Sequence, residues 1–179
     1  DTVAYLKLLD DYHEGPAMWR VLNFPFWKIP QEDLTNLSYW AGRRAWSLYE
    51  TLRRAPELGA FSPEVLGIFA HITGLIEKHS RLTRSATLPY LIYAFLEESG
   101  YLKHAVDEKT SREQISFLNQ FYKKIQEFEF SFPHAPLKEF LRAIDLELQS
   151  GETGTLETDL DSGPETVKII TVHSAKGLE

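Results

Sequence analysis

The polar residues at the end of the sequence have types and a spacing that could do chemistry. The stretch TVHSAKGLE, residues 171–179, carries in order the hydroxyl of Thr171, the imidazole of His173, the hydroxyl of Ser174, the ammonium of Lys176, the flexible Gly177 and the carboxylate of Glu179. This set suits contact with a phosphate or a sugar. It lacks the spacing of a P-loop, which ends in Gly-Lys-Ser or Gly-Lys-Thr. By composition alone, an ordinary turn with solvated polar residues remains an alternative.

A short apolar stretch directly precedes these polar residues. Val167, Ile169, Ile170 and Val172 are β-branched, which predicts a buried strand that ends where the polar turn begins. A lone strand leaves its backbone groups unpaired, and no other convincing strand is predicted in the chain. We therefore expect its partner strands in an α/β domain of a longer protein. In such sheets ligands bind beyond the carboxyl ends of the strands, where residues 173–179 would lie.

The sequence before residue 150 is predicted to be helical. Apolar residues recur at helical spacing in about eight segments, so the expected fold class is all-α with the one short C-terminal β-strand. Gly42 is expected to separate the third helix from the fourth, and Pro56 to end the fourth. Ser62 and Pro63 predict the start of the clearest helix, because serine is a good N-cap and proline suits the first turn.

Further boundary signals follow in the second half of the sequence. Ser99-Gly100 predicts a left-handed helix end, and TSRE, residues 110–113, predicts a capping box at the next helix start. Pro133 and Pro136 are expected to separate the last two helices. The final helix is expected to bury one face, formed by Leu137, Phe140, Leu141, Ile144 and Leu148.

Composition divides the chain into three parts. Residues 1–149 are the predicted helical body, residues 150–166 are rich in Gly, Ser, Thr and acids and predict a flexible linker, and residues 167–179 are the strand and turn. The sequence also begins inside a predicted helix, without a starting Met. We therefore expect a piece of a longer chain, in which the helical body is an insertion that leaves an α/β domain and returns to it.

The overall composition narrows the classes of function. The formal charge is −7, and its excess comes from seven acids between Arg142 and Lys168, while acids and bases balance elsewhere. This argues against a broad basic surface wrapped by nucleic acid. The absence of cysteine excludes disulfides and thiolate metal sites, and the histidines show no metal-ligand spacing. No apolar stretch reaches the roughly 20 residues that cross a bilayer, so a soluble, cytoplasmic protein without a membrane partner is expected.

The stretch VKIITVHSAKGLE, residues 167–179, resembles motif V of the UvrD/Rep/PcrA-like superfamily 1 DNA helicases. Upstream, AYLKLL and WRVLNFPFWKIP resemble the start of the helical 2B subdomain of that family, and EESGYL and LKEFLRAIDL resemble its later helices. The resemblance covers essentially the whole chain. In this family the 2B subdomain is an insertion in the second RecA-like motor domain, called 2A, and motif V begins when the chain returns to 2A.

The resemblance implies a function for the longer protein. Such helicases couple ATP hydrolysis, with Mg²⁺, to 3′-to-5′ movement along single-stranded DNA. Thr171 and His173 would then contact the DNA strand, and Gly177 and Glu179 would face the nucleotide. The implied partners are single-stranded DNA with adjoining duplex, the remaining helicase domains in cis, and repair or replication proteins. Residues 1–179 alone are expected to be inactive and to hold no cofactor.

The connector around residue 28 departs from the family pattern. Where the family often has Gly-Ile-Gly, whose amides meet duplex phosphates, this sequence has Lys28, Ile29 and Pro30. Pro30 has no N–H to donate. Lys28 could contact DNA by its charge, or be an ordinary solvated lysine. The neighbouring aromatic residues, Phe24, Phe26 and Trp27, could stack on bases, although packing within the connector is the favoured interpretation.

Other residues and functions stay open at this stage. The pairs Arg43/Arg44 and Arg53/Arg54 are candidate phosphate contacts or solvated helix faces. One alternative function is a helical protein-interaction or autoinhibitory module, because a near-neutral body with an acidic tail suits docking to protein. Another is part of a RecB-type helicase-nuclease.

Overall fold

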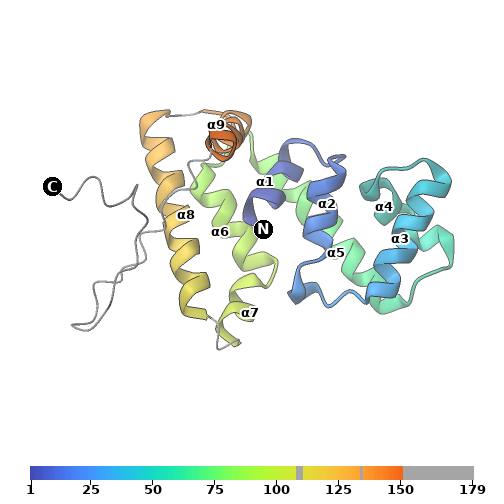
Figure 1. Ribbon diagram of the computed structural model, residues 1–179. Coiled ribbons are helices and arrows are strands. Elements are labelled where there is room, and N and C mark those ends of the chain that lie inside the picture. Colours follow the sequence, from blue (N-terminus) through green and yellow to red (C-terminus); the bar gives the residue numbers. More distant parts are fainter. Residues whose placement is uncertain (108–110, 134, 151–179) are drawn as a thin grey trace, which may run out of the picture.

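The computed structural model describes residues 1–107, 111–133 and 135–150, and this part of the chain is helical (Figure 1). In chain order the elements are α1 (Thr2–Asp10), α2 (Gly15–Leu22), the 3-10 helix η1 (Pro25–Trp27), α3 (Gln31–Arg44), α4 (Leu48–Leu58), α5 (Pro63–Leu82), α6 (Leu88–Glu98), α7 (Tyr101–Asp107), α8 (Ser111–Ser131) and α9 (Leu137–Ser150). The described residues contain no strand, which confirms an all-α body. The predicted strand, most of the linker and Thr171, His173, Gly177 and Glu179 lie outside the described residues.

The helices are arranged along the long helix α5. It packs against α4 toward one end of the molecule and against α1 and α6 toward the other (Figure 1). α3 packs on α4 at the first end, and α7 and α8 pack on α6 at the second. Ser62 caps α5 by accepting a hydrogen bond from the Val65 amide at 3.3 Å, with Pro63 as the first helical residue. The predicted start of α5 is therefore confirmed.

Two predicted helix boundaries are wrong. Gly42 lies inside α3, and Pro56 lies inside α4. α3 instead ends at Ala45, whose φ of 52° is left-handed, and α4 ends at Gly59, with a φ of 60°. Pro56 lies two residues before the end of α4, so the hydrogen bond that its missing N–H removes belongs to the final turn of the helix.

The helix count also differs from the prediction. Gly100 adopts the expected left-handed conformation after α6, with a φ of 81°, but the chain then forms α7 at once. The described part therefore has nine α-helices, where about eight were predicted. The seven residues of α7 are too few to show a helical period by themselves. The structure does not describe the side chains of the predicted capping box, residues 110–113.

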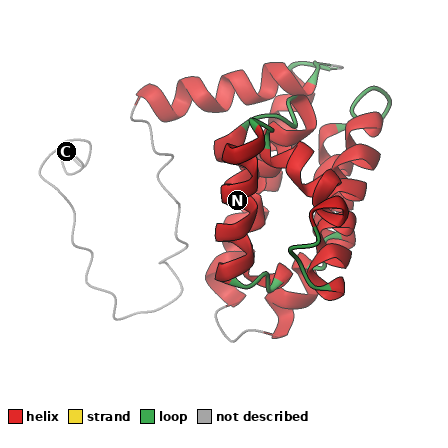
Figure 2. Ribbon diagram, turned by 90° about the vertical axis from the view of Figure 1, so that its right-hand side faces the viewer, coloured by secondary structure: helices red, strands yellow, loops and turns green. Residues whose placement is uncertain are grey.

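The core draws on helices from the whole described chain. Its largest fully buried side chains include Tyr5, Phe69, Phe95 and Phe140, from α1, α5, α6 and α9. The predicted buried face of α9 is confirmed for the first four of its five residues. The prediction that Leu148 is buried is wrong, because its side chain is 62% exposed. The last turns of α9 project beyond the body (Figure 2). Helical spacing predicts which face of a helix is apolar, but not how far the neighbouring helices extend along that face.

The first and last described helices lie against each other. α1 packs on α9, and Lys7 Nζ donates to the Asp145 carboxylate at 2.9 Å. This contact raises the pKa of Lys7, chiefly through the hydrogen bond. A second ion pair, between Lys124 and Glu147, joins α8 to α9. Both ends of the described body are therefore on the same side of the fold.

A buried polar network joins α1, α5 and α6. The hydroxyl of Tyr5 lies 2.6 Å from Nδ1 of the fully buried His79, and Nε2 of His79 lies 3.3 Å from the Glu98 carboxylate, which also accepts from Lys78. A carboxylate only accepts, so Nε2 carries the proton, and Nδ1 of the neutral ring accepts from Tyr5. Burial lowers the pKa of His79 and raises that of Tyr5. The network is thus built for a neutral imidazole.

This network predicts a loss of stability in mild acid. Because the pKa of His79 is lower in the folded state than its ordinary value of 6.5, the unfolded chain binds the proton more tightly. The free energy of unfolding should therefore fall as the pH drops from about 7 to about 5, before the carboxylate of Glu98, whose pKa is also lowered, begins to titrate. Urea unfolding at several pH values measures this dependence.

Two variants test whether His79, rather than another histidine, causes this pH dependence of stability. His79→Gln keeps a donor and an acceptor but does not titrate, so its stability should change less over this pH range. His71 is exposed on the same helix. His71→Gln should therefore show the same pH dependence of stability as the unsubstituted chain. An unaltered pH profile in His79→Gln would show that another group is responsible.

Candidate nucleic-acid interface

The connector between α2 and α3 is built by aromatic packing. Phe24 and Trp27 are buried, with exposed fractions of 4% and 6%, and the indole N–H of Trp27 donates to the Val21 carbonyl at 2.9 Å. Phe26 is half-buried, and its ring meets that of Tyr101 edge-on at 5.7 Å. The packing interpretation of these rings is therefore confirmed, and Phe24 and Trp27 offer no face for a base.

Lys28 is an exposed residue of this connector and directly follows η1. Its backbone is left-handed, with φ 54° and ψ 34°, and its amide donates to the Pro25 carbonyl at 3.3 Å, which closes η1. The side chain is exposed and forms no hydrogen bond or ion pair with the described residues. It is therefore free to approach an anion from solvent.

The start of α3, next to Lys28, is less favourable to phosphate. Pro30 is the N-cap residue of α3, and it has no N–H. Glu32 and Asp33 occupy the first turn of α3, where carboxylates stabilise the positive end of the helix dipole and repel a second anion. At this loop Lys28 supplies the one side-chain cation among residues 23–33.

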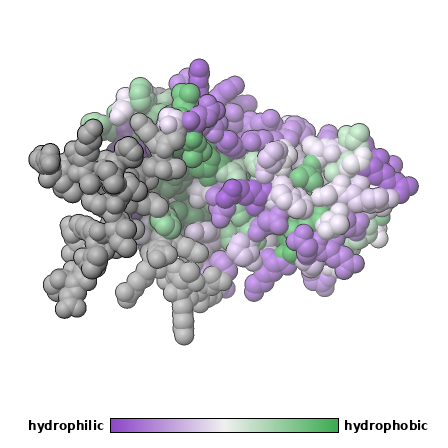
Figure 3. All heavy atoms as spheres, viewed as in Figure 1, coloured by the Kyte–Doolittle hydropathy of each residue, from purple (hydrophilic) through white to green (hydrophobic). Residues whose placement is uncertain are grey.

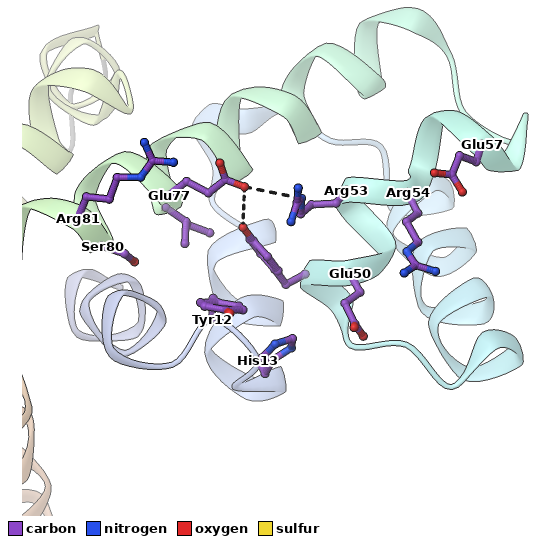
Figure 4. Close-up of a pocket in the computed structure, with 11 residues that line it drawn as sticks. Tyr12, His13, Glu50, Arg53, Arg54, Glu57, Glu77, Ser80 and Arg81 are labelled. Atoms are coloured by element: carbon purple, nitrogen blue, oxygen red, sulfur yellow. Dashed lines mark hydrogen bonds and ion pairs between the residues drawn. The ribbon is translucent and has the colours of Figure 1, made fainter.

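The two arginines of the second pair, Arg53 and Arg54, have different partners. In Figure 4, Arg53 points toward Glu77, whereas Arg54 points away from it. The Nε atom of Arg53 is 3.6 Å from Glu77, which also accepts from the Tyr49 hydroxyl at 2.9 Å. Burial and this hydrogen bond raise the pKa of Tyr49 to about 12. Arg53 is thus committed to a contact within the protein.

Arg54 instead joins Arg43 and Arg44. Their guanidinium groups lie over the rings of Trp40 and Trp46, and we call these five residues the arginine–tryptophan cluster. Arg43 is 5.4 Å from the centre of the Trp40 ring, and Arg54 is 4.5 Å from that of Trp46. Arg44 lies between the two rings, 5.7 Å from each. The arginines were predicted as candidate phosphate contacts, whereas no role was predicted for the tryptophans that hold them.

The turn after α3 brings this cluster together. Because Ala45 is left-handed, the Trp46 amide reaches back to the Ala41 carbonyl at 3.0 Å, which places Trp46 beside the last turn of α3. Ser47 then starts α4 with a capping box, in which Glu50 accepts from the Ser47 amide at 2.9 Å. Arg54 follows on α4, one turn after Glu50, and its guanidinium group lies over the Trp46 ring.

A polar hollow of about 630 Å³ lies beside the cluster, between α4, α5 and the turn after α1 (Figure 4). Its acidic and basic side chains alternate, and its histidine, His13, is 2.9 Å from the Ser47 hydroxyl. Among the described residues, no group of three or more His, Asp or Glu side chains is placed to hold a metal ion. The hollow therefore suits polar contacts better than metal-assisted chemistry.

Comparison with known proteins gives the family. Residues 1–179 match the UvrD-like helicase C-terminal domain. The whole chain is 26% identical to a probable DNA helicase II homolog of Rickettsia felis and 24% identical to the ATP-dependent DNA helicase PcrA of Staphylococcus aureus, and spans 26% and 24% of their lengths. It is 22% identical over 99% of its length to an ATP-dependent helicase/nuclease of Pediococcus pentosaceus, of which it spans 14%.

The chain thus spans about a quarter or less of the relatives that it matches. In the described part of the chain, no helix is both long enough and apolar enough to cross a membrane. The match over all 179 residues means that this chain belongs to the family of UvrD-like helicase C-terminal domains.

Proposed function

We propose that this chain is the 2B-like, duplex-engaging and regulatory part of an ATP-dependent 3′-to-5′ DNA helicase. The observation that carries the proposal is the family match over residues 1–179, together with relatives named as DNA helicases. In this assignment, residues 1–149 are the 2B-like body and residues 150–166 are an acidic linker. Residues 167–179 are the strand and motif V of the 2A domain.

The packing of α1 on α9 supports an insertion. An insertion must leave and rejoin its host domain at neighbouring points, so its first and last elements should lie close together. The contact between Lys7 and Asp145, at 2.9 Å, holds those two helices side by side. The body described by residues 1–150 could therefore be carried on one edge of a motor domain.

The residues at the end of the chain receive roles in this proposal. Thr171 and His173 would hydrogen-bond the backbone of the DNA strand without reading its sequence. Gly177 and Glu179 would face ATP, with the carboxylate accepting from a ribose hydroxyl. ATP hydrolysis would supply the energy for movement. The sequence contains no P-loop, so we expect Mg²⁺ and the groups that hydrolyse ATP in other parts of the helicase, and no ATP hydrolysis by the chain alone.

The proposal is tested by binding of the 179-residue chain to a fluorescent duplex with a 3′ single-stranded tail. We expect binding that weakens as salt is raised from about 50 to about 200 mM, because phosphate contacts release counterions. No detectable affinity at the lowest salt would overturn the duplex-engaging role.

Lys28 is the connector residue with the clearest expected effect. Lys28→Ala should lower the affinity for the tailed duplex and reduce the slope of log affinity against log salt by about 0.9, the value for one phosphate contact. Lys28→Gly removes the same charge and relieves the left-handed backbone, so both variants should bind alike if charge is the cause. Lys103→Ala, at an exposed position of α7, is the charge-matched control. An equal loss of affinity in Lys103→Ala would mean that Lys28 makes no specific contact with the duplex.

A second candidate function is a protein-interaction or autoinhibitory module. It is favoured by apolar side chains that remain exposed on or beside α8 and α9: Phe130 at 89%, Phe132 at 59%, Leu146 at 59% and Leu148 at 62%. Green, hydrophobic residues are visible on this side of the molecule in Figure 3. Capture of a purified helicase or repair protein by the chain, without DNA binding, would favour this function. The match to a helicase/nuclease keeps a helicase-nuclease host open as well.

A further inference from the structure

The arginine–tryptophan cluster concentrates positive charge on an otherwise acidic chain. Residues 39–54 contain four arginines and a single carboxylate, Glu50, whereas the whole chain carries a charge of −7. Glu50 is engaged in the capping box of α4, and its hydrogen bond with the Ser47 amide lowers its pKa. Glu50 therefore stays ionised, and its charge also acts on Arg54. The three cluster arginines still outnumber this one carboxylate.

The cluster arginines form no ion pair with a described carboxylate, although the charge of Glu50 acts on Arg54. Arg53 pairs with Glu77, and Arg20 with Asp1, but Arg43, Arg44 and Arg54 form no ion pair with a described carboxylate. Arg43 donates instead to the hydroxyl of Tyr39, at 2.7 Å, whose ring is 55% exposed. Their guanidinium groups thus keep donors available to an anion that arrives from solvent.

The tryptophans fix where these guanidinium groups lie. A guanidinium over an aromatic face is attracted by the ring and loses side-chain freedom before any ligand binds. The order along the surface alternates: Arg43, Trp40, Arg44, Trp46, Arg54. Since the rings are already in contact with guanidinium groups, their role here is to hold the cations rather than to stack on bases. A row of pre-positioned guanidinium groups suits an extended anion with repeated charges.

We infer that the arginine–tryptophan cluster binds the phosphate backbone of duplex DNA, independently of sequence. This inference rests on the proposed function, which brings duplex DNA to this chain and so favours phosphates over an acidic peptide. The cluster is separate from Lys28, because the two lie at opposite ends of α3, whose 14 residues span about 20 Å. The two contacts can therefore be tested independently.

The test uses the 179-residue chain and the same tailed duplex. The triple variant Arg43→Gln, Arg44→Gln and Arg54→Gln should bind about tenfold or more weakly at low salt, and its salt slope should fall by about 0.9 for each arginine that contacts a phosphate. The control carries the same charge change at exposed positions elsewhere, as Arg84→Gln, Lys123→Gln and Arg142→Gln. It should keep most of the affinity. Circular dichroism and thermal melting verify that both variants fold.

A lysine variant tests the role of the rings. With Lys at positions 43, 44 and 54 the charge is kept but the planar groups that stack on Trp40 and Trp46 are lost. We expect affinity between those of the unsubstituted chain and the Gln variant. Binding equal to the unsubstituted chain would overturn the pre-positioning by tryptophan.

The outcomes distinguish this inference from the proposed function. If the unsubstituted chain binds the duplex and both triple Gln variants lose affinity equally, the cluster inference is wrong while the duplex-engaging role stands. If the unsubstituted chain does not bind the duplex at all, both are wrong. If the cluster variant loses affinity for polyglutamate but not for the duplex, the surface recognises acidic protein, and the inference is overturned.

Discussion

In a full-length helicase that carries this chain, Glu179→Ala is expected to lower ATP turnover while the affinity for single-stranded DNA stays unchanged. The proposal places the Glu179 carboxylate against a ribose hydroxyl of ATP. A hydrogen bond to a charged group contributes about 1.5–3 kcal/mol, so kcat/KM for ATP should fall roughly 10- to 100-fold. Phosphate release at low ATP, with saturating single-stranded DNA, measures this change.

The control variant also removes one glutamate carboxylate, but at a position away from the proposed nucleotide site. Glu165→Ala removes a carboxylate from the predicted linker, and both activities should be unchanged. Fluorescence anisotropy of a labelled single strand measures DNA affinity in all three proteins. Loss of DNA binding with normal hydrolysis in Glu179→Ala would contradict the assignment, because it would place Glu179 on the DNA side.

Phe95→Ala is expected to have the largest effect on stability. Phe95 is 1% exposed, its ring stacks on that of Tyr5 at 4.0 Å, and the ring of Phe24 lies 6.2 Å away. Truncating a buried phenylalanine to alanine costs about 3–5 kcal/mol, from lost burial and the cavity that remains. Domains have only about 5–15 kcal/mol of total stability, so this variant should be close to unfolding. Urea unfolding followed by circular dichroism measures the loss.

Tyr90→Ala on the same helix is the matched control. Tyr90 is 52% exposed, so its truncation should change the free energy of unfolding by about 0.5 kcal/mol or less. The Phe95 variant should also bind duplex less well, because Phe24 begins the connector that carries Lys28. A loss of less than about 1 kcal/mol in Phe95→Ala would mean that the packing between α1 and α6 does not hold this fold together.

Many helix boundaries could be predicted because their causes are local. Ser62 and Pro63 start α5 through a cap and a fixed φ, and Gly100 follows α6 through its freedom to adopt a left-handed backbone. Gly42 and Pro56 misled the prediction, since both residues weaken a helix without necessarily ending it. The actual end of α3 is a left-handed Ala45, a conformation that propensity does not predict for alanine.

The candidate site could be predicted only in part. Lys28 was predicted to be either a DNA contact or a solvated lysine, and the structure shows only that its side chain is exposed. The arginines appeared in the sequence as two adjacent pairs. Neighbours on a helix point in different directions, so Arg53 turns to Glu77 while Arg54 turns to Trp46. The signal that could have suggested the cluster is the presence of Trp40 and Trp46 on either side of Arg43 and Arg44.

The sequence by itself determined the helical body, most of its starts and stops, and, through the residues from Val167 to Glu179, the resemblance to a helicase family. These features depend on local backbone preference, apolar period and a contiguous motif, all of which are written along the chain. Only the tertiary structure decided which arginines are paired internally, which are held by tryptophan, and that α1 lies against α9. Those contacts join residues that the helices bring together from different positions and directions, and no local pattern encodes them.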